Sequence, residues 1–120
     1  MARKLSTKTK IKRYEKILIQ LLEEWKDYLK NYADSHFYII DKTNREYLFF
    51  ENGWREKRYV HLVMFHLAIH ESGKVLFRVN HTDKDIAGDL VEMGIDKADL
   101  VFLMQPEKVR PYTGFGVLSE

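Results

Sequence analysis

The sequence predicts a single α+β domain in which an N-terminal helix packs on a four-stranded antiparallel meander, followed by one or two short C-terminal helices. Apolar residues recur at the spacing of an amphipathic helix over residues 11–33. Between residues 36 and 81 they alternate with polar residues instead, as in β-strands. After residue 82 the helical spacing returns. A chain of 120 residues, 45% of them hydrophobic, has the size and composition of one globular domain.

Residues 1–10 are expected to form a flexible basic arm, so that the folded domain spans residues 11–120. Residues 1–13 carry six basic side chains and no acidic one, whereas the remaining 107 residues carry 14 basic and 18 acidic side chains, a net charge of −4. The six are Arg3, Lys4, Lys8, Lys10, Lys12 and Arg13. Such an arm can contact nucleic-acid phosphates without sequence specificity, or it can be a solvated chain terminus.

The helix over residues 11–33 is expected to bury one face. Its apolar positions follow the i, i+3, i+4, i+7 pattern, and charged residues fill the opposite face. The apolar stripe consists of Ile11, Tyr14, Ile17, Leu18, Leu21, Leu22, Trp25, Tyr28, Leu29 and Tyr32. A stripe of this kind is typical of a helix that covers a protein core.

Four strands are predicted at residues 36–41, 45–52, 58–71 and 74–81. Gly53 is expected to end the second strand, and residues 72–74 are expected to form the turn before the fourth. Because the links are short, consecutive strands are expected to pair antiparallel as a meander. In the fourth strand, Val75, Phe77 and Val79 are expected to share one face.

The third strand is expected to lie in the middle of the sheet because both of its faces are apolar. One face is predicted to hold Val63, Phe65, Leu67 and Ile69, and the other to hold Val60, Leu62, Met64, His66, Ala68 and His70. Helices would then cover one face of the sheet and a partner protein the other. The strand is also long enough to extend past its neighbours and pair across a two-fold axis, which would make a homodimer.

Helix signals and turn residues alternate in the C-terminal part. Thr82 is expected to cap a helix that ends at Gly94, and Asp96 is a second N-cap candidate. Residues 97–103 then form a short helix, or residues 100–103 a buried strand, and the spacing does not separate the two. The alternation of aromatic and small residues over 112–117 also favours a terminal strand.

The residue content argues against most catalytic sites. The chain has no cysteine, which excludes disulfides, thiol nucleophiles and Cys-ligated metals. His66 and His70 would lie about 13 Å apart along a strand, too far to share a metal, and His66 is expected to be half-buried with a backbone partner. We therefore expect a protein that is no enzyme and has no cofactor or metal. We also expect a cytoplasmic location, since no apolar run reaches membrane-spanning length and no secretory signal is visible.

Trp54 is the residue most suggestive of an interaction, because three basic side chains follow it. Trp and Arg are typical anchors of protein interfaces, and an aromatic ring beside cations can also stack on a nucleic-acid base. A third alternative places Trp54 in the core at the end of the sheet. The candidates for partner binding are Trp54, Arg58, Tyr112 and Phe115. The candidates for nucleic-acid binding, the alternative function, are Arg3, Lys4, Lys8, Lys10, Arg55 and Lys57.

The order of these motifs resembles the XisI family, the cyanobacterial fdxN element excision controlling factors. The similarity covers roughly residues 12–118. The matching pieces are Tyr14 to Trp25, Gly53-Trp54 with Arg58, His66, Gly73-Lys74-Val75, Asp85-Ile86-Ala87, Leu90-Val91, Gly94-Ile95, Asp99-Leu100-Val101, Pro106 with Arg110, and Tyr112-Thr113 with Phe115 and Val117. The chain departs from the family pattern at Ala68, where an aspartate is usual, and at Gly116, where an alanine is usual.

The resemblance implies a compact α+β fold and an accessory role in programmed DNA rearrangement. It implies a non-enzymatic factor that contacts a nuclease-like XisH-type protein, a recombinase, or both, with DNA contacted indirectly. The family pattern contains no established catalytic residues, so none is assigned to this chain.

Overall fold

The computed structural model describes residues 6–31 and 35–118, which form two α-helices and a five-stranded sheet. Helix α1 spans Thr7–Tyr28 and helix α2 spans Ile86–Met93. The strands are β1 (His36–Asp41), β2 (Glu46–Arg55), β3 (Arg58–Ile69), β4 (Val75–Asn80) and β5 (Leu100–Phe102). Two single-turn 3₁₀ helices, η1 (Lys97–Asp99) and η2 (Arg110–Tyr112), complete the fold. The α+β fold predicted from the sequence is confirmed.

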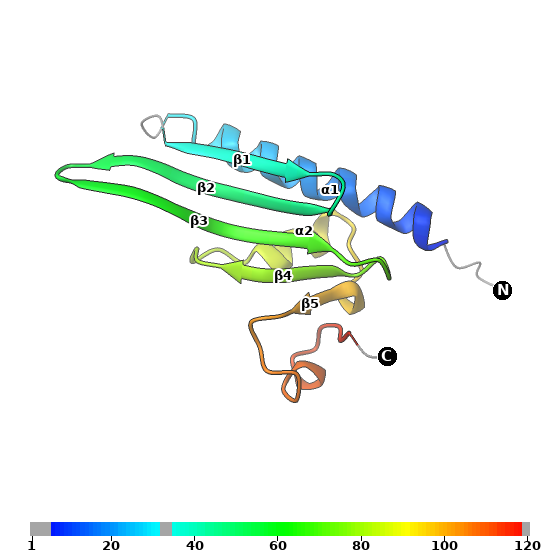
Figure 1. The fold of residues 1–120 in the computed structure, drawn as a ribbon. Coiled ribbons are helices and arrows are strands. Elements are labelled where there is room, and N and C mark those ends of the chain that lie inside the picture. Colours follow the sequence, from blue (N-terminus) through cyan, green and yellow to red (C-terminus); the bar gives the residue numbers. More distant parts are fainter. Residues whose placement is uncertain (1–5, 32–34, 119–120) are drawn as a thin grey trace.

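The sheet has the order β1-β2-β3-β4-β5 (Figure 1). Strands β1 to β4 are antiparallel neighbours, as the meander prediction requires. Strand β5 instead runs parallel to β4, because α2 carries the chain back across the sheet before β5 begins. Of the two alternatives for residues 97–103, the structure combines the single turn η1 with a short strand.

Helix α1 begins earlier than its apolar stripe predicts. Ser6 is the N-cap, and its hydroxyl accepts a hydrogen bond from the backbone N–H of Thr9 at 3.1 Å. Lys8 and Lys10 therefore belong to the helix, and the part of the predicted arm that lies outside the described residues is 1–5. The helix ends at Tyr28 rather than at residue 33. No helix in the described part of the chain is long and apolar enough to cross a membrane.

The core lies between the two helices and one face of the sheet. Helix α1 buries Tyr14, Leu18, Leu21 and Leu22, and α2 buries Ile86, Ala87 and Leu90 in the same cluster. From the sheet the cluster takes Tyr47, Phe49, Phe65, Leu67, Ile69, Val75, Phe77 and Leu100. Both helices therefore pack against the same face, which we call the inner face. In the described part of the chain neither α1 nor α2 packs on the opposite face, which we call the outer face.

Two irregularities in strand pairing change which side chains share a face. Phe49 pairs with Phe65 but Phe50 pairs with Val63, so Met64 is an extra residue in β3. Val63 therefore lies on the outer face with Phe50, and its predicted place beside Phe65 is wrong. A second irregularity pairs His66 with Val79, so Val79 also lies on the outer face rather than with Phe77.

Strand β2 runs through Gly53 instead of ending there. Gly53 has a φ of 150° and pairs with Val60, and the strand ends at Arg55. The turn to β3 is the two-residue link Glu56-Lys57, with Glu56 in a left-handed conformation at φ 57°. This continuation makes the β2–β3 hairpin longer than its neighbours.

The C-terminal part differs from the predictions in two places. Asp85, not Thr82, caps α2, and its carboxylate accepts from the N–H of Gly88 at 3.0 Å. Gly94 ends α2 in a left-handed conformation and Asp96 caps η1, as predicted. No strand forms over residues 112–117; that segment makes only one backbone hydrogen bond to β5, from the N–H of Gly116 to the carbonyl of Leu100 at 2.8 Å.

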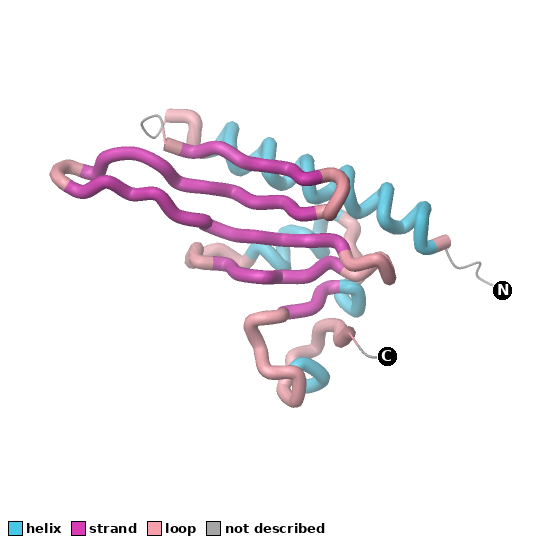
Figure 2. Tube along the Cα trace, viewed as in Figure 1, coloured by secondary structure: helices cyan, strands magenta, loops and turns pink. Residues whose placement is uncertain are grey.

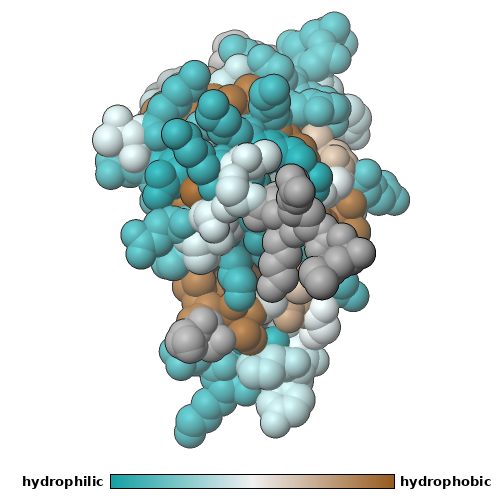
Figure 3. Space-filling model, turned by 90° about the vertical axis from the view of Figure 1, so that its right-hand side faces the viewer, coloured by the Kyte–Doolittle hydropathy of each residue, from teal (hydrophilic) through white to brown (hydrophobic). Residues whose placement is uncertain are grey.

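The molecule is elongated, with extents of 58 × 29 × 26 Å. The β2–β3 hairpin forms one end, because both strands extend past β1 and β4 (Figure 2). The start of α1 lies toward the opposite end (Figure 1). Seen from that side, the surface is largely hydrophilic, with hydrophobic patches mainly in its lower half (Figure 3).

Candidate protein-interaction surface

The outer face of β1, β2 and β3 carries apolar side chains that no other element of the described chain covers. Their positions follow from the register, since directly paired residues share a face: Phe37 pairs with Phe50, and Ile39 pairs with Leu48. The rings of Phe37 and Phe50 stack with centroids 4.8 Å apart, and Ile39 is 48% exposed. Phe37, Leu48, Phe50 and Val63 are partly exposed.

The C-terminal segment covers only the β4–β5 side of this face. Ala68, Leu76 and Val101 form a small second cluster there, against which Leu103 and Leu118 pack. The uncovered area is therefore the part over β1, β2 and the first half of β3. An apolar sheet face of this kind is typical of an interaction site.

The projecting end of the β2–β3 hairpin, residues 52–61, continues the outer face; we call it the hairpin tip. Trp54 and Tyr59 are paired across the two strands, with ring centroids 5.4 Å apart. They are 69% and 52% exposed. The amide oxygen of Asn52 accepts a hydrogen bond from the Tyr59 hydroxyl at 2.7 Å and lies 2.7 Å from Nδ1 of His61. These contacts orient the aromatic side chains before any partner binds, and the predicted core alternative for Trp54 is wrong.

The cations near Trp54 differ in their environment. Arg55 pairs with the carboxylate of Glu51, which is buried on the inner face. Lys57 and Arg58 are exposed. Arg55, Arg58 and Glu51 also line a hollow of about 490 Å³ beneath the hairpin. Burial, together with the positive charge of Arg55, lowers the pKa of nearby His36 below its ordinary value.

The other two candidates for partner binding lie away from the hairpin tip. Tyr112 is 88% exposed at the end of η2. Phe115 packs edge-on against Phe102 with centroids 4.7 Å apart, and the ammonium group of Lys97 lies 4.9 Å from its ring. Figure 1 places this C-terminal segment beside β5, far from the hairpin end of the molecule. Trp54 and Arg58 thus lie in the same hairpin but on opposite faces of the sheet, whereas Tyr112 and Phe115 form a separate region.

The candidates for nucleic-acid binding do not form one surface. Lys8 and Lys10 lie near the start of α1, and Lys10 forms an ion pair with Asp99 at 3.1 Å. Arg55 and Lys57 lie at the hairpin tip, at the other end of the molecule (Figure 1). Arg3 and Lys4 fall outside the described residues.

A polar network lies on the outer face next to the apolar area. Oε1 of Glu46 lies 2.7 Å from Nε2 of His66, and both carboxylate oxygens accept from the Arg78 guanidinium at 2.9 Å. His66 therefore has a side-chain partner, and the predicted backbone partner is wrong. Among the described residues, no three acidic or histidine side chains are grouped so that they could hold a metal.

Sequence reasoning missed most of the outer face, including Phe37, Ile39, Phe50 and Tyr59. The signal lies in residues 37–40 and 47–50, which form unbroken apolar runs and therefore place apolar side chains on both faces of each strand. Knowing which of these side chains face one another required the register, and the extra residue Met64 shifts that register in the middle of β3.

A comparison with known families matches nearly the whole of the described fold. The family model described as XisI protein matches residues 8–117, which cover α1 from its second residue, α2 and strands β1 to β5. The chain belongs to the XisI family. The resemblance that the motif order suggested is confirmed. A comparison with curated proteins gives no match.

Two solved structures of cyanobacterial proteins share the XisI fold of this chain. A XisI-like protein from Anabaena variabilis ATCC 29413 is 26% identical, with a TM-score of 0.80 over 89% of this chain and 98% of that one. The fdxN element excision controlling factor XisI from the same organism is 23% identical, with a TM-score of 0.73 over 89% of this chain and 97% of that one.

The two departures from the XisI pattern have clear places in the structure. Ala68 is buried and lies directly opposite Glu46 in the β2–β3 register, so an aspartate at this position would face a second carboxylate. Gly116 lies against the backbone of η1 and β5, where a Cβ atom would meet the carbonyl oxygen of Ala98 at 2.0 Å. Both differences therefore affect packing within this chain.

Proposed function

We propose that this XisI-family protein is a non-enzymatic accessory factor that controls excision of a DNA element by contacting other proteins. The partner would be a nuclease-like XisH-type protein, a recombinase, or both. The proposal is supported by membership of a family whose solved relatives include an excision controlling factor. The observation that carries it is the exposed Trp54 at the end of an uncovered apolar sheet face.

The outer face has the composition of an interface. Its centre is apolar, with Phe37, Ile39 and Phe50, and its end holds the exposed aromatic residues Trp54 and Tyr59. Aromatic residues and arginine are enriched at energetic hot spots of protein interfaces, where lost contacts cost most. Because Trp54 is largely exposed in the isolated chain, its removal should affect binding more than folding.

Replacing Trp54 by alanine is the direct test. We expect Trp54→Ala to weaken binding of a purified XisH-type protein from the same genome by about tenfold or more, since truncating a hot-spot aromatic costs about 2 kcal/mol. Binding would be measured by isothermal titration calorimetry on nuclease-treated proteins, so that DNA cannot bridge them. The free energy of unfolding should change by less than about 0.5 kcal/mol.

Tyr112→Ala is the matched control, because Tyr112 is also a largely exposed aromatic residue but lies in the separate C-terminal region. We expect it to leave the affinity unchanged. The opposite result, a loss with Tyr112→Ala and none with Trp54→Ala, would move the interface to the C-terminal segment. Unchanged affinity in both variants would refute the assignment to either aromatic residue.

Deleting residues 112–120 is a poor substitute for these variants. The sequence alone suggests that this tail can be removed without loss of the fold. In the structure Phe115 and Leu118 pack against the two apolar clusters, and the carbonyl of Val117 accepts from the Lys74 ammonium group. The deletion would therefore uncover β5 as well as remove Tyr112.

A further inference from the structure

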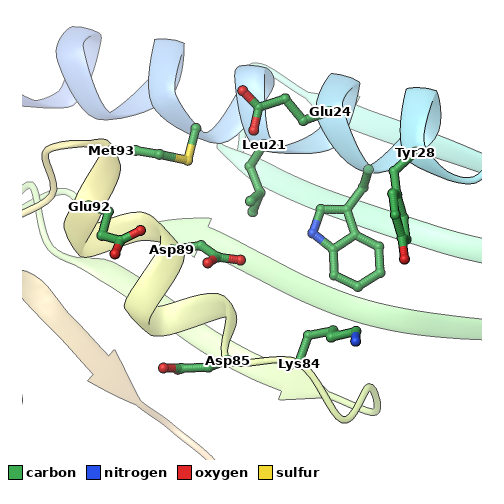
Figure 4. A pocket seen from close by; sticks show the side chains of 9 residues that line it. Leu21, Glu24, Tyr28, Lys84, Asp85, Asp89, Glu92 and Met93 are labelled. Atoms are coloured by element: carbon green, nitrogen blue, oxygen red, sulfur yellow. The ribbon is translucent and has the colours of Figure 1, made fainter.

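A groove between α1 and α2 lies on the helical side of the sheet, away from the outer face. It has a volume of about 510 Å³ and is open to solvent. Leu21 from α1 and Met93 from α2 point toward each other across it (Figure 4). No part of the proposed function uses this groove, and the inference below does not depend on that proposal.

The floor of the groove is an apolar strip on α1. Leu21, Trp25 and Tyr28 are spaced i, i+4 and i+7, so they follow one another along a single face for about 10 Å. Trp25 packs edge-on against Phe49 and Phe65, with centroids 5.8 and 5.2 Å away, which fixes its ring at the base of the groove. Tyr28 is 66% exposed.

The opposite wall is an acidic ridge on α2. Asp85, Asp89 and Glu92 have the same i, i+4, i+7 spacing, and Glu24 adds a fourth carboxylate from α1. Lys84 is the only cation among the lining residues. In the described part of the chain no Lys or Arg lies within ion-pair distance of these four carboxylates.

Helix stability explains only some of these charges. Asp85 caps α2 and Asp89 lies in its first turn, where acidic groups are favourable. Glu92 is one residue from the C-terminal end of α2, where the helix dipole disfavours a negative charge, and no basic residue accompanies it in the last turn. Its position is better suited to a cation that binds in the groove.

We infer that the groove binds a cationic amphipathic helix of another protein. The apolar side of such a helix would lie on Leu21, Trp25 and Met93, and its Lys or Arg residues would face Asp85, Asp89 and Glu92. The apolar strip and the acidic ridge both repeat at the i, i+4, i+7 spacing of a helix. A ligand helix whose apolar and basic faces repeat at the same spacing would therefore match both. The same carboxylates would repel a nucleic acid.

The test uses the full chain and a capped peptide of about two heptads, with leucine on one face and lysine on the other. The control peptide has glutamate in place of each lysine. Trp25 and Trp54 are the two tryptophans of the chain, so in a Trp54→Phe background the fluorescence of Trp25 reports on the groove. We expect the basic peptide to bind, to change this fluorescence, and to bind more weakly as salt is raised.

The charge variants decide the site. Glu24→Gln/Glu92→Gln should weaken the basic peptide about tenfold, from two ion pairs of up to about 1 kcal/mol each. The matched control Glu71→Gln/Glu107→Gln removes two exposed carboxylates outside the groove and should leave the affinity unchanged. Circular dichroism and urea unfolding would confirm that both variants keep the fold.

Three results would overturn the inference. The first is equal binding of the acidic peptide, and the second is equal weakening by both pairs of substitutions. The third is a chain that sediments as a dimer and becomes monomeric in the Glu24→Gln/Glu92→Gln variant, which would make a second copy of this protein the occupant.

Discussion

Glu46 is the central residue of the polar network on the outer face, where it joins β2, β3 and β4. Burial alone would raise the pKa of its carboxyl, but the hydrogen bonds from Arg78 and His66 outweigh burial and hold the pKa below the ordinary value of 4.5. A carboxyl whose pKa is lowered by folding stabilises the folded state when it is ionised. The stabilisation by ionised Glu46 is therefore fully present at pH values above the ordinary pKa of the carboxyl. It is lost as the pH falls through the lowered pKa of the folded state.

We expect Glu46→Gln to lower the free energy of unfolding by about 1 kcal/mol at neutral pH, because the network is partly exposed. The difference from the unchanged chain should shrink as the pH is lowered from about 6 to about 3. Urea unfolding across this range measures it. A difference that stays constant with pH would show that ionised Glu46 does not stabilise the fold, and the exposed Glu71→Gln provides the baseline.

The structural role of a single residue could be predicted from the sequence where it depends only on neighbouring residues. Gly94 and Asp96 are such cases, because a left-handed C-cap and an N-cap depend on a few neighbouring residues. Trp54 could be singled out by the cations after it, but its exposure could not be predicted. The contact of His66 with Glu46 depends on the register between β2 and β3. The ion pair of Arg55 with Glu51 depends on the continuation of β2 through Gly53.

At the scale of elements, the segment after η2 is attached to β5 through Gly116. A Cβ atom at this position would meet the carbonyl oxygen of Ala98 at 2.0 Å and the carbonyl oxygen of Leu100 at 3.2 Å. Both neighbours are backbone atoms of η1 and β5, so the strand or the segment would have to move. The close approach allows the N–H of Gly116 to reach the carbonyl of Leu100.

We expect Gly116→Ala to lower the free energy of unfolding by about 1–3 kcal/mol, the usual cost of overpacking, although alanine is usual here in the XisI pattern. Thermal and urea unfolding would measure the loss. Glu107→Ala, an exposed change in the loop before η2, should stay within about 0.5 kcal/mol. A neutral Gly116→Ala would mean that η1 and β5 have room to shift.

The elements predicted best were those with several periods of pattern, namely α1 and the four strands of the meander. Their ends were less certain, because no apolar residue lies between the N-cap Ser6 and Ile11, and because β2 continues through Gly53. A strand at residues 100–103 was one of two alternatives, because a three-residue strand is too short to show a period. Its parallel pairing with β4 was not visible locally. The prediction of a terminal strand over residues 112–117 was wrong. This segment makes a single backbone hydrogen bond to β5, from Gly116, and one bond does not form a strand pair.

At the scale of the whole molecule, the basic residues are divided between two ends of an elongated shape. The cations of α1 and those of the hairpin tip lie toward opposite ends of a molecule 58 Å long. Two of them, Lys10 and Arg55, are already paired with carboxylates. A protein that tracks a phosphate backbone presents its cations on one continuous surface, so the shape favours the protein-contact proposal over direct DNA binding.

A buried contact connects α1 with η1, which lies 85 residues later in the sequence. The Tyr14 hydroxyl donates to the carboxylate of Asp99 at 2.6 Å and accepts from the N–H of Asp96 at 3.2 Å. Lys10 adds an ion pair to the same carboxylate. Burial, followed by the hydrogen bond to Asp99, raises the pKa of Tyr14 to about 12, so the phenol stays protonated and keeps donating.

Tyr14→Phe should therefore destabilise the whole fold. The substitution leaves a buried carboxylate without its shortest hydrogen bond, which costs about 1–3 kcal/mol. Chemical unfolding measures the loss, and Tyr112→Phe, which removes a hydroxyl from an exposed ring, should be close to neutral. If Tyr14→Phe is as stable as the unchanged chain, the contact with Asp99 does not hold α1 and η1 together.

The contact between Tyr14 and Asp99 also affects folding of the chain during its synthesis on the ribosome. Helix α1 is translated before η1, and Asp99 follows Tyr14 by 85 residues. At about 5–20 residues per second, the ribosome needs roughly 4–17 s to add that stretch. During this time the apolar stripe of α1, with Leu18 and Leu22, has only part of its core to pack against. Until Asp99 is added, the nascent chain therefore exposes part of the apolar stripe of α1, and surface of this kind promotes aggregation.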